Sequence, residues 1–120
     1  MARLAPAVAL IAFLWVTPAR AEPTTNGDMS RICDKAAGEP FSGTQEIMNL
    51  GDCWGFIRGV WEMHVAWGTP PLVCLPPGAD YSQMAKVYLK WTRDNPAKLH
   101  EKAVIGAFAA WREAFPCPKP

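Results

Sequence analysis

Four cysteines are the residues of this chain best suited to chemistry, and they stand at Cys33, Cys53, Cys74 and Cys117. Zinc sites usually take their ligands from close pairs such as C-x2-C, whereas these cysteines are separated by 20, 21 and 43 residues. An even number of cysteines in a small exported chain is typical of a disulfide framework. The sequence therefore predicts two disulfides rather than metal ligands or thiolate nucleophiles.

The two histidines offer little for catalysis. His64 stands one turn before Gly68, where the end of a helix favours an imidazolium. His100 is followed by Glu101, but adjacent helical residues point in different directions, so these two do not form a dyad. The sequence lacks a nucleophile elbow, a glycine-rich phosphate loop and an H-E-x-x-H pattern. We therefore expect no enzymatic activity, no metal and no cofactor.

The first 21 residues have the parts of a secretory signal peptide. Arg3 supplies a positive start, an apolar run covers residues 4–16, and Ala19 and Ala21 occupy the two positions that a signal peptidase reads. This apolar run is shorter than a membrane-spanning helix, which needs about 20 apolar residues. We predict cleavage before Glu22 and export from the cytoplasm, which is the setting in which disulfides form.

The mature chain, residues 22–120, has the size of one small domain. Removing Arg3 and Arg20 leaves ten basic against eleven acidic residues, a net charge of −1. Because no basic cluster occurs, nucleic acid is not an expected partner. No second long apolar segment follows, so we expect no membrane association after signal cleavage.

Helix start and stop signals divide the mature chain into four helices. Ser42 with Gln45, and Asp80 with Gln83, form capping-box patterns, and Pro96 stands at the position that a helix start permits. The expected helices cover about residues 26–37, 42 to about 67, 80 to about 94, and 95 or 96 to about 115. The prediction is an all-α fold, a small four-helix domain stapled by two disulfides.

This layout favours one of the three ways of pairing the cysteines. In consecutive antiparallel helices, the end of one lies near the start of the next. Cys33 is late in the first helix and Cys53 is in the first half of the second, while Cys74 precedes the third helix and Cys117 follows the fourth. We therefore predict Cys33–Cys53 and Cys74–Cys117, with chain-entropy contributions of roughly 3 and 4 kcal/mol.

The second helix carries glycines at every fourth residue, Gly51, Gly55 and Gly59. Each costs about 1 kcal/mol of helix propensity relative to alanine, so close approach of another backbone is expected. We predict that this stripe packs inside the chain against small residues of the fourth helix; a glycine-lined homodimer contact is the alternative. The matching small residues of the fourth helix are Ala103, Ala107 and Ala110.

Tryptophan is frequent in the mature chain, with five residues, and Trp67 stands beside a proline-rich segment. Residues 68–79 contain four prolines and two glycines, which predicts an ordered loop. An exposed aromatic beside a rigid loop is a good binding anchor; packing of Trp67 beneath the loop is the alternative. The composition favours a binding module.

The segment C-W-G-F-I-R-G-V, residues 53–60, resembles the C-x-G-[YF]-I-x-G-V segment of the Rap/Tai family of immunity proteins. Phe56 replaces the commoner tyrosine, and Glu62 stands where many members have aspartate. The resemblance extends over about residues 32–117. Its further pieces are Cys74-Leu75-Pro76, Gln83, Val87-Tyr88-Leu89, Asn95-Pro96 and Phe115-Pro116-Cys117.

The resemblance implies an exported, disulfide-bonded, all-helical protein that is often dimeric. Members of the family protect the bacterial periplasm from a peptidoglycan amidase delivered by type VI secretion. They bind the toxin and block its active-site groove. By resemblance, this chain is a periplasmic immunity protein whose partner is such an amidase.

For such an inhibitor, the loop of residues 68–79 is the first choice of contact surface, because its prolines and Cys74 limit the entropy lost on binding. We expect apolar contacts from Trp67, Leu72, Val73 and Leu75. The alternative function is a small periplasmic stress chaperone, which would bind many unfolded clients after acid exposure rather than one folded partner at neutral pH.

Overall fold

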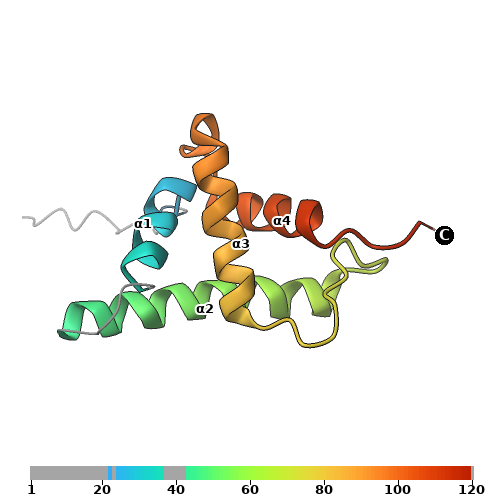
Figure 1. Cartoon of the computed structure of the whole chain (residues 1–120), viewed down its shortest axis with the longest axis horizontal. Helices are drawn as coiled ribbons and strands as arrows, with labels where there is room; N and C mark the ends of the chain where they lie inside the picture. Colours follow the sequence, from blue (N-terminus) through green and yellow to red (C-terminus); the bar gives the residue numbers. More distant parts are fainter. Residues whose placement is uncertain (1–21, 23, 37–42, 120) are drawn as a thin grey trace, which may run out of the picture.

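The computed structural model describes residues 22, 24–36 and 43–119, so the predicted signal peptide, residues 1–21, lies outside them. The described chain forms four α-helices and one 3-10 helix (Figure 1). Thr25 and Lys102 form an isolated β-bridge, and no longer strand occurs among these residues. The predicted all-α fold with four helices is confirmed. The elements are α1 (Asn26–Ala36), α2 (Thr44–Trp67), α3 (Tyr81–Asp94), η1 (Pro96–Lys98) and α4 (Ala103–Ala114).

Helix α2 forms the base of the molecule in Figure 1; α1 and α3 stand steeply to it, α3 crossing in front of it, and α4 runs above it in roughly the same direction. The start of α3 has the predicted cap: the Asp80 carboxylate accepts a hydrogen bond from the Gln83 backbone N–H at 2.8 Å. The start of α2 differs, because its N-cap is Gly43, which offers no side-chain cap. The predicted cap, Ser42, lies outside the described residues. None of the described helices is long and apolar enough to cross a membrane.

The fourth helix is shorter than predicted. The chain after Pro96 makes a single 3-10 turn, and α4 begins only at Ala103. The backbone between them bonds to α1 instead of continuing the helix. The carbonyls of Glu101 and Leu99 accept hydrogen bonds from the N–H groups of Asn26 and Gly27, at 2.8 and 2.9 Å. These contacts satisfy donors at the start of α1 that no helical carbonyl can reach. A continuous helix would use the same carbonyls internally.

The core is built around large side chains whose polar atoms all have partners. Trp111 of α4 is fully buried, and its indole N–H donates to the Met84 carbonyl at 3.0 Å. The hydroxyl of buried Tyr88 donates to Asn26 Oδ1 at 2.9 Å. Gly106 packs against the same amide, since a Cβ there would lie 2.0 Å from Asn26 Oδ1. The Asn26 amide therefore joins α1, α3 and α4 in one place.

Both disulfides have the predicted pairing. Cys33–Cys53 joins α1 to α2 and is buried, with Cα atoms 5.1 Å apart. Cys74–Cys117 joins the loop before α3 to the segment after α4, with Cα atoms 4.8 Å apart. The second bridge is more exposed than the first, because both of its cysteines are only half-buried.

Candidate partner-binding surfaces

The proline-rich loop begins with a sharp turn at the end of α2. The Gly68 N–H donates to the His64 carbonyl at 2.6 Å. A Cβ at Gly68 would lie 2.4 Å from that oxygen and 2.6 Å from the His64 ring, so the turn requires glycine. This turn takes the chain away from α2 and makes Trp67 the last side chain before the loop. The Thr69–Pro70 peptide bond that follows is cis.

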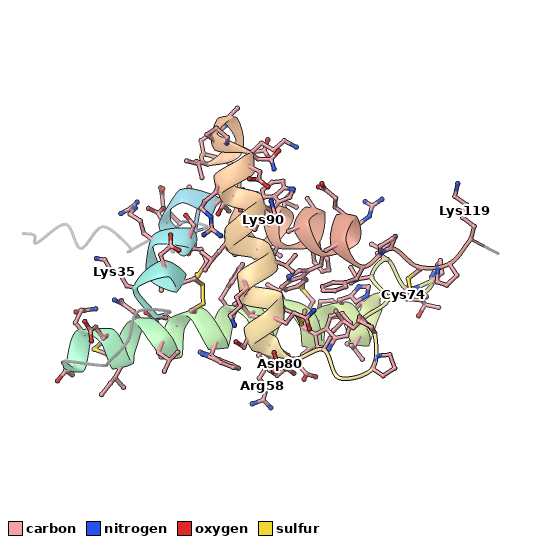
Figure 2. The ribbon with its side chains drawn as sticks, in the orientation of Figure 1. Lys35, Arg58, Cys74, Asp80, Lys90 and Lys119 are labelled. Atoms are coloured by element: carbon pink, nitrogen blue, oxygen red, sulfur yellow. A yellow bond between two sulfur atoms is a disulfide. The ribbon has the colours of Figure 1, made fainter. Side chains whose placement is uncertain are left out.

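The loop is held at its middle and at its end. The Cys74 N–H donates to the Phe115 carbonyl at 3.0 Å, beside the disulfide to Cys117, and Figure 2 shows Cys74 next to the segment that follows α4. Closer to α3, the Ala79 N–H donates to the Pro76 carbonyl at 3.1 Å. Gly78, between them, has a positive φ of 83° that favours glycine. The backbone of the loop is therefore ordered before any partner binds.

The four residues predicted to make apolar contacts lie in different environments. Trp67 is 79% exposed and Leu72 is 51% exposed, so both are accessible to a partner. Val73 is only 2% exposed and belongs to the hydrophobic core, so its assignment to the contact surface is wrong. Leu75 is half-buried and packs against the core. Neighbouring residues of the loop thus face opposite environments, solvent for Leu72 and the core for Val73.

The predicted packing of the glycine stripe against α4 is also wrong. Gly51, Gly55 and Gly59 are exposed, and a Cβ at any of them would meet no atom within 4 Å. The core face of α2 lies on the other side of the helix and is formed by Cys53, Ile57, Val60 and His64. The glycines therefore lie on an open side of α2.

The small residues of α4 do pack inside the chain, but with different partners. Ala103, Ala107 and Ala110 are buried. Helix α4 packs chiefly against α3 and α1 and touches α2 little. The alanines thus allow α4 to pack closely against α3 and α1. The glycines of α2 make no comparable contact among the described residues.

A second exposed apolar surface, which the sequence reasoning missed, runs along α2. Ile47, Met48 and Val65 are each more than half exposed, and Trp54 is exposed beside Tyr81, with ring centroids 6.4 Å apart. Apolar residues surround α2 instead of forming one stripe, and a helix of that kind is normally covered on all sides. The available signal was that the apolar residues of 44–67 are spread around the helix and do not keep to one face.

The histidines form no reactive arrangement. His64 is buried between the rings of Trp61 and Phe108, with ring centroids at 5.3 and 5.6 Å. His100 is exposed in the turn before α4. Within residues 24–36 and 43–119, no three His, Cys, Asp or Glu side chains come together as they would around a metal ion.

A shallow groove lies between α3 and α4, on another side of the molecule. Its floor includes Val87 and Ala110, and its rim carries Lys90, Asp94 and Glu113. Lys90 and Asp94 form a salt bridge across one helical turn, and Figure 2 shows Lys90 on the outer side of α3. With charges of both signs on its rim, the groove favours no particular ligand.

Comparison with known proteins gives one match. Residues 25–117 match the sequence profile of a family described as Rap1a immunity proteins. The match runs from the residue before α1 to the last cysteine and so includes all the helices and both disulfides. No curated protein and no solved structure matches the chain.

Proposed function

The chain belongs to the family of Rap1a immunity proteins, and we propose that it neutralises a peptidoglycan amidase toxin of a type VI secretion system. The resemblance to Rap/Tai immunity proteins is thereby confirmed. In this proposal the protein acts in the periplasm, where it binds the toxin and covers its active-site groove. It performs no chemistry of its own.

The observation that carries the proposal is the pair of exposed apolar side chains at the start of the proline-rich loop, Trp67 and Leu72. Trp67 and Leu72 present apolar side chains to solvent on a backbone that a disulfide and four prolines constrain. A preorganised loop loses little entropy when it binds, and tryptophan is among the commonest energetic anchors of interfaces. An exposed apolar surface on a constrained backbone of this kind suits binding over an enzyme groove.

Two features support a periplasmic location. Two disulfides are the mark of an oxidising compartment, and the first 21 residues have the composition of a signal peptide. We also propose that the protein works as a homodimer, because the apolar side chains Ile47, Met48 and Val65 of α2 are each more than half exposed.

The direct test is binding of the exported, oxidised protein to a panel of purified peptidoglycan amidases at pH 7, with hydrolysis measured in parallel. We expect one amidase to bind stoichiometrically and to lose activity. Capture of many unfolded clients at low pH, with no amidase bound at pH 7, would support a stress chaperone instead.

Substitutions locate the contact surface. Trp67→Ala and Leu72→Asp should each weaken toxin binding roughly 30-fold, the effect of an interface residue worth about 2 kcal/mol. Ile105→Asp on α4 is the matched control, since Ile105 is exposed to a similar extent as Leu72. Val73→Asp is unsuitable, because a buried charge would unfold the core. Equal affinities for the loop variants and the control would exclude the loop.

A further inference from the structure

The two disulfides lie in different surroundings. Cys33 and Cys53 are members of the hydrophobic core. Cys74 and Cys117 are half-buried, and neither belongs to the core or packs against it. Thiol–disulfide exchange needs access of an attacking thiolate to one of the two sulfurs. A small dithiol therefore reaches the Cys74–Cys117 bridge more readily than the buried one.

The accessible bridge holds the middle of the proline-rich loop against the segment that follows α4. Beside it, the Cys74 N–H donates to the Phe115 carbonyl at 3.0 Å, and Cys117 Sγ lies 3.4 Å from the Pro71 carbonyl oxygen. Within the described chain, the bond to Phe115 is the only hydrogen bond between backbone groups that ties residues 69–79 to a distant part of the sequence. The disulfide is the one covalent connection between these two segments.

The rest of the fold is held independently of this bridge. Cys33–Cys53 joins α1 to α2 inside the core, and the hydrogen bonds of Trp111 and Tyr88 join α4 to α3 and α3 to α1. None of these contacts involves the accessible bridge. Its opening should therefore loosen the loop and the C-terminal segment locally, without unfolding the helices.

Opening follows ordinary thiol–disulfide exchange. A thiolate of the dithiol attacks one sulfur of the bridge and forms a mixed disulfide, and the S–S bond between Cys74 and Cys117 breaks. The second thiol of the reductant then attacks the mixed disulfide, and the reductant leaves as its own disulfide. Two electrons pass from the dithiol to the bridge, and Cys74 and Cys117 each take up one of the two protons that the dithiol loses.

We propose that Cys74–Cys117 is a thiol–disulfide exchange site for a dithiol, and that its opening frees the middle of the proline-rich loop and weakens toxin binding. The freed loop has more conformations to lose on binding, so its affinity falls. The buried side chain of Val73 still keeps the loop close to the core, so the loss of affinity is partial. The effect on the toxin rests on the proposed function, whereas the exchange site and the release of the loop do not.

The first test titrates the oxidised protein with dithiothreitol, traps free thiols with iodoacetamide and maps them by mass spectrometry. Cys74 and Cys117 should be labelled at a dithiothreitol concentration at least about tenfold lower than that required for the buried bridge. Labelling of all four cysteines together would overturn the exchange site.

The second test opens the bridge permanently, with Cys74→Ser and Cys117→Ser in one protein that keeps Cys33–Cys53. Hydrogen exchange of the backbone N–H at position 74 should be at least about tenfold faster than in the unchanged oxidised protein, while the amides of α4 keep their protection. An amidase that binds the oxidised protein should bind this variant at least about tenfold more weakly. The control is Thr69→Ser with Lys119→Ser, which changes one exposed residue of each segment and keeps the bridge; it should behave like the unchanged protein.

The outcomes separate the proposals. If the amides of α4 lose protection together with position 74, the bridge supports the whole fold and its local control of the loop is wrong. If position 74 exchanges as slowly as in the control, the loop is not released and the inference fails. If an amidase binds the oxidised protein and the variant equally, the proposed function stands and its redox control is wrong. If no amidase binds the oxidised protein, the proposed function fails together with its redox control, and the titration and hydrogen exchange still decide the exchange site.

Discussion

Replacing all three glycines of α2 by alanine should stabilise the monomer. Gly51, Gly55 and Gly59 lie inside α2, and none has a positive φ. A Cβ at each would meet no atom within 4 Å, so the methyl groups introduce no clash. The substitutions therefore act through helix propensity alone.

The expected gain follows from that propensity. Each glycine-to-alanine change in an exposed helix interior is worth about 1 kcal/mol, so the triple variant should gain about 3 kcal/mol in its free energy of unfolding. A domain of this size gains about 4–8 °C in Tm per kcal/mol. The Tm should rise by between about 12 and 24 °C, a large change beside a total stability of about 5–15 kcal/mol.

The assay is urea unfolding of the oxidised protein at low concentration, where self-association is negligible, followed by thermal unfolding. Gly106→Ala is the matched control, with an expected change in stability of the opposite sign, because the added Cβ would lie 2.0 Å from Asn26 Oδ1. We expect the control to lower stability. A triple variant that is no more stable than the unchanged protein would refute the reasoning, since it would mean that the stripe is in contact with another part of the chain.

Three further changes test the core and the caps, each read from urea midpoints. Tyr88→Phe removes the donor to buried Asn26 Oδ1 and should cost about 1–3 kcal/mol. Burial raises the pKa of Tyr88 above its ordinary 10.0, so the stability it contributes is complete below pH 10 and declines at higher pH; the variant should lack this alkaline decline. Asp80→Ala removes the α3 cap and should cost about 1 kcal/mol, whereas an unchanged midpoint would show that the cap is dispensable. The Thr25 hydroxyl donates to the Asp28 carboxylate at 2.7 Å and lowers the pKa of Asp28. The stability that ionised Asp28 contributes is therefore present above pH 3.8 and is lost as the pH falls. Asp28→Asn should make the stability less sensitive to acid.

Local signals in the sequence predicted the number and order of the four helices and the pairing of the disulfides. The Asp80 cap lies three residues from the N–H that it satisfies, so the start of α3 could be predicted without knowing the fold. The pairing of Cys33 with Cys53 was predicted from their places along the chain, with Cys33 late in α1 and Cys53 in the first half of α2. Trp67 was expected to be exposed because it adjoins prolines, and it is the most exposed of the large hydrophobic side chains described.

The errors arose where distant parts of the chain decide the outcome. The start of α4 depends on α1, whose N–H groups use the carbonyls of Leu99 and Glu101. The core face of α2 could not be read from periodicity, because apolar residues such as Ile47 and Val65 occur on its exposed sides too. Val73 is buried while its neighbour Leu72 is exposed, a difference that the composition of the loop does not specify.

The two disulfides divide the chain into two covalent rings, residues 33–53 and 74–117, joined by a single strand of backbone. A protease that cuts inside a ring, for instance at Gly78, leaves both fragments linked. A cut between Gly68 and Val73 separates the rings completely. Trp67 and Leu72 thus lie in or beside the segment between the rings, where a cut leaves no disulfide joining the two halves of the chain. The prolines around them protect this segment from proteolysis as well as shaping it for a partner.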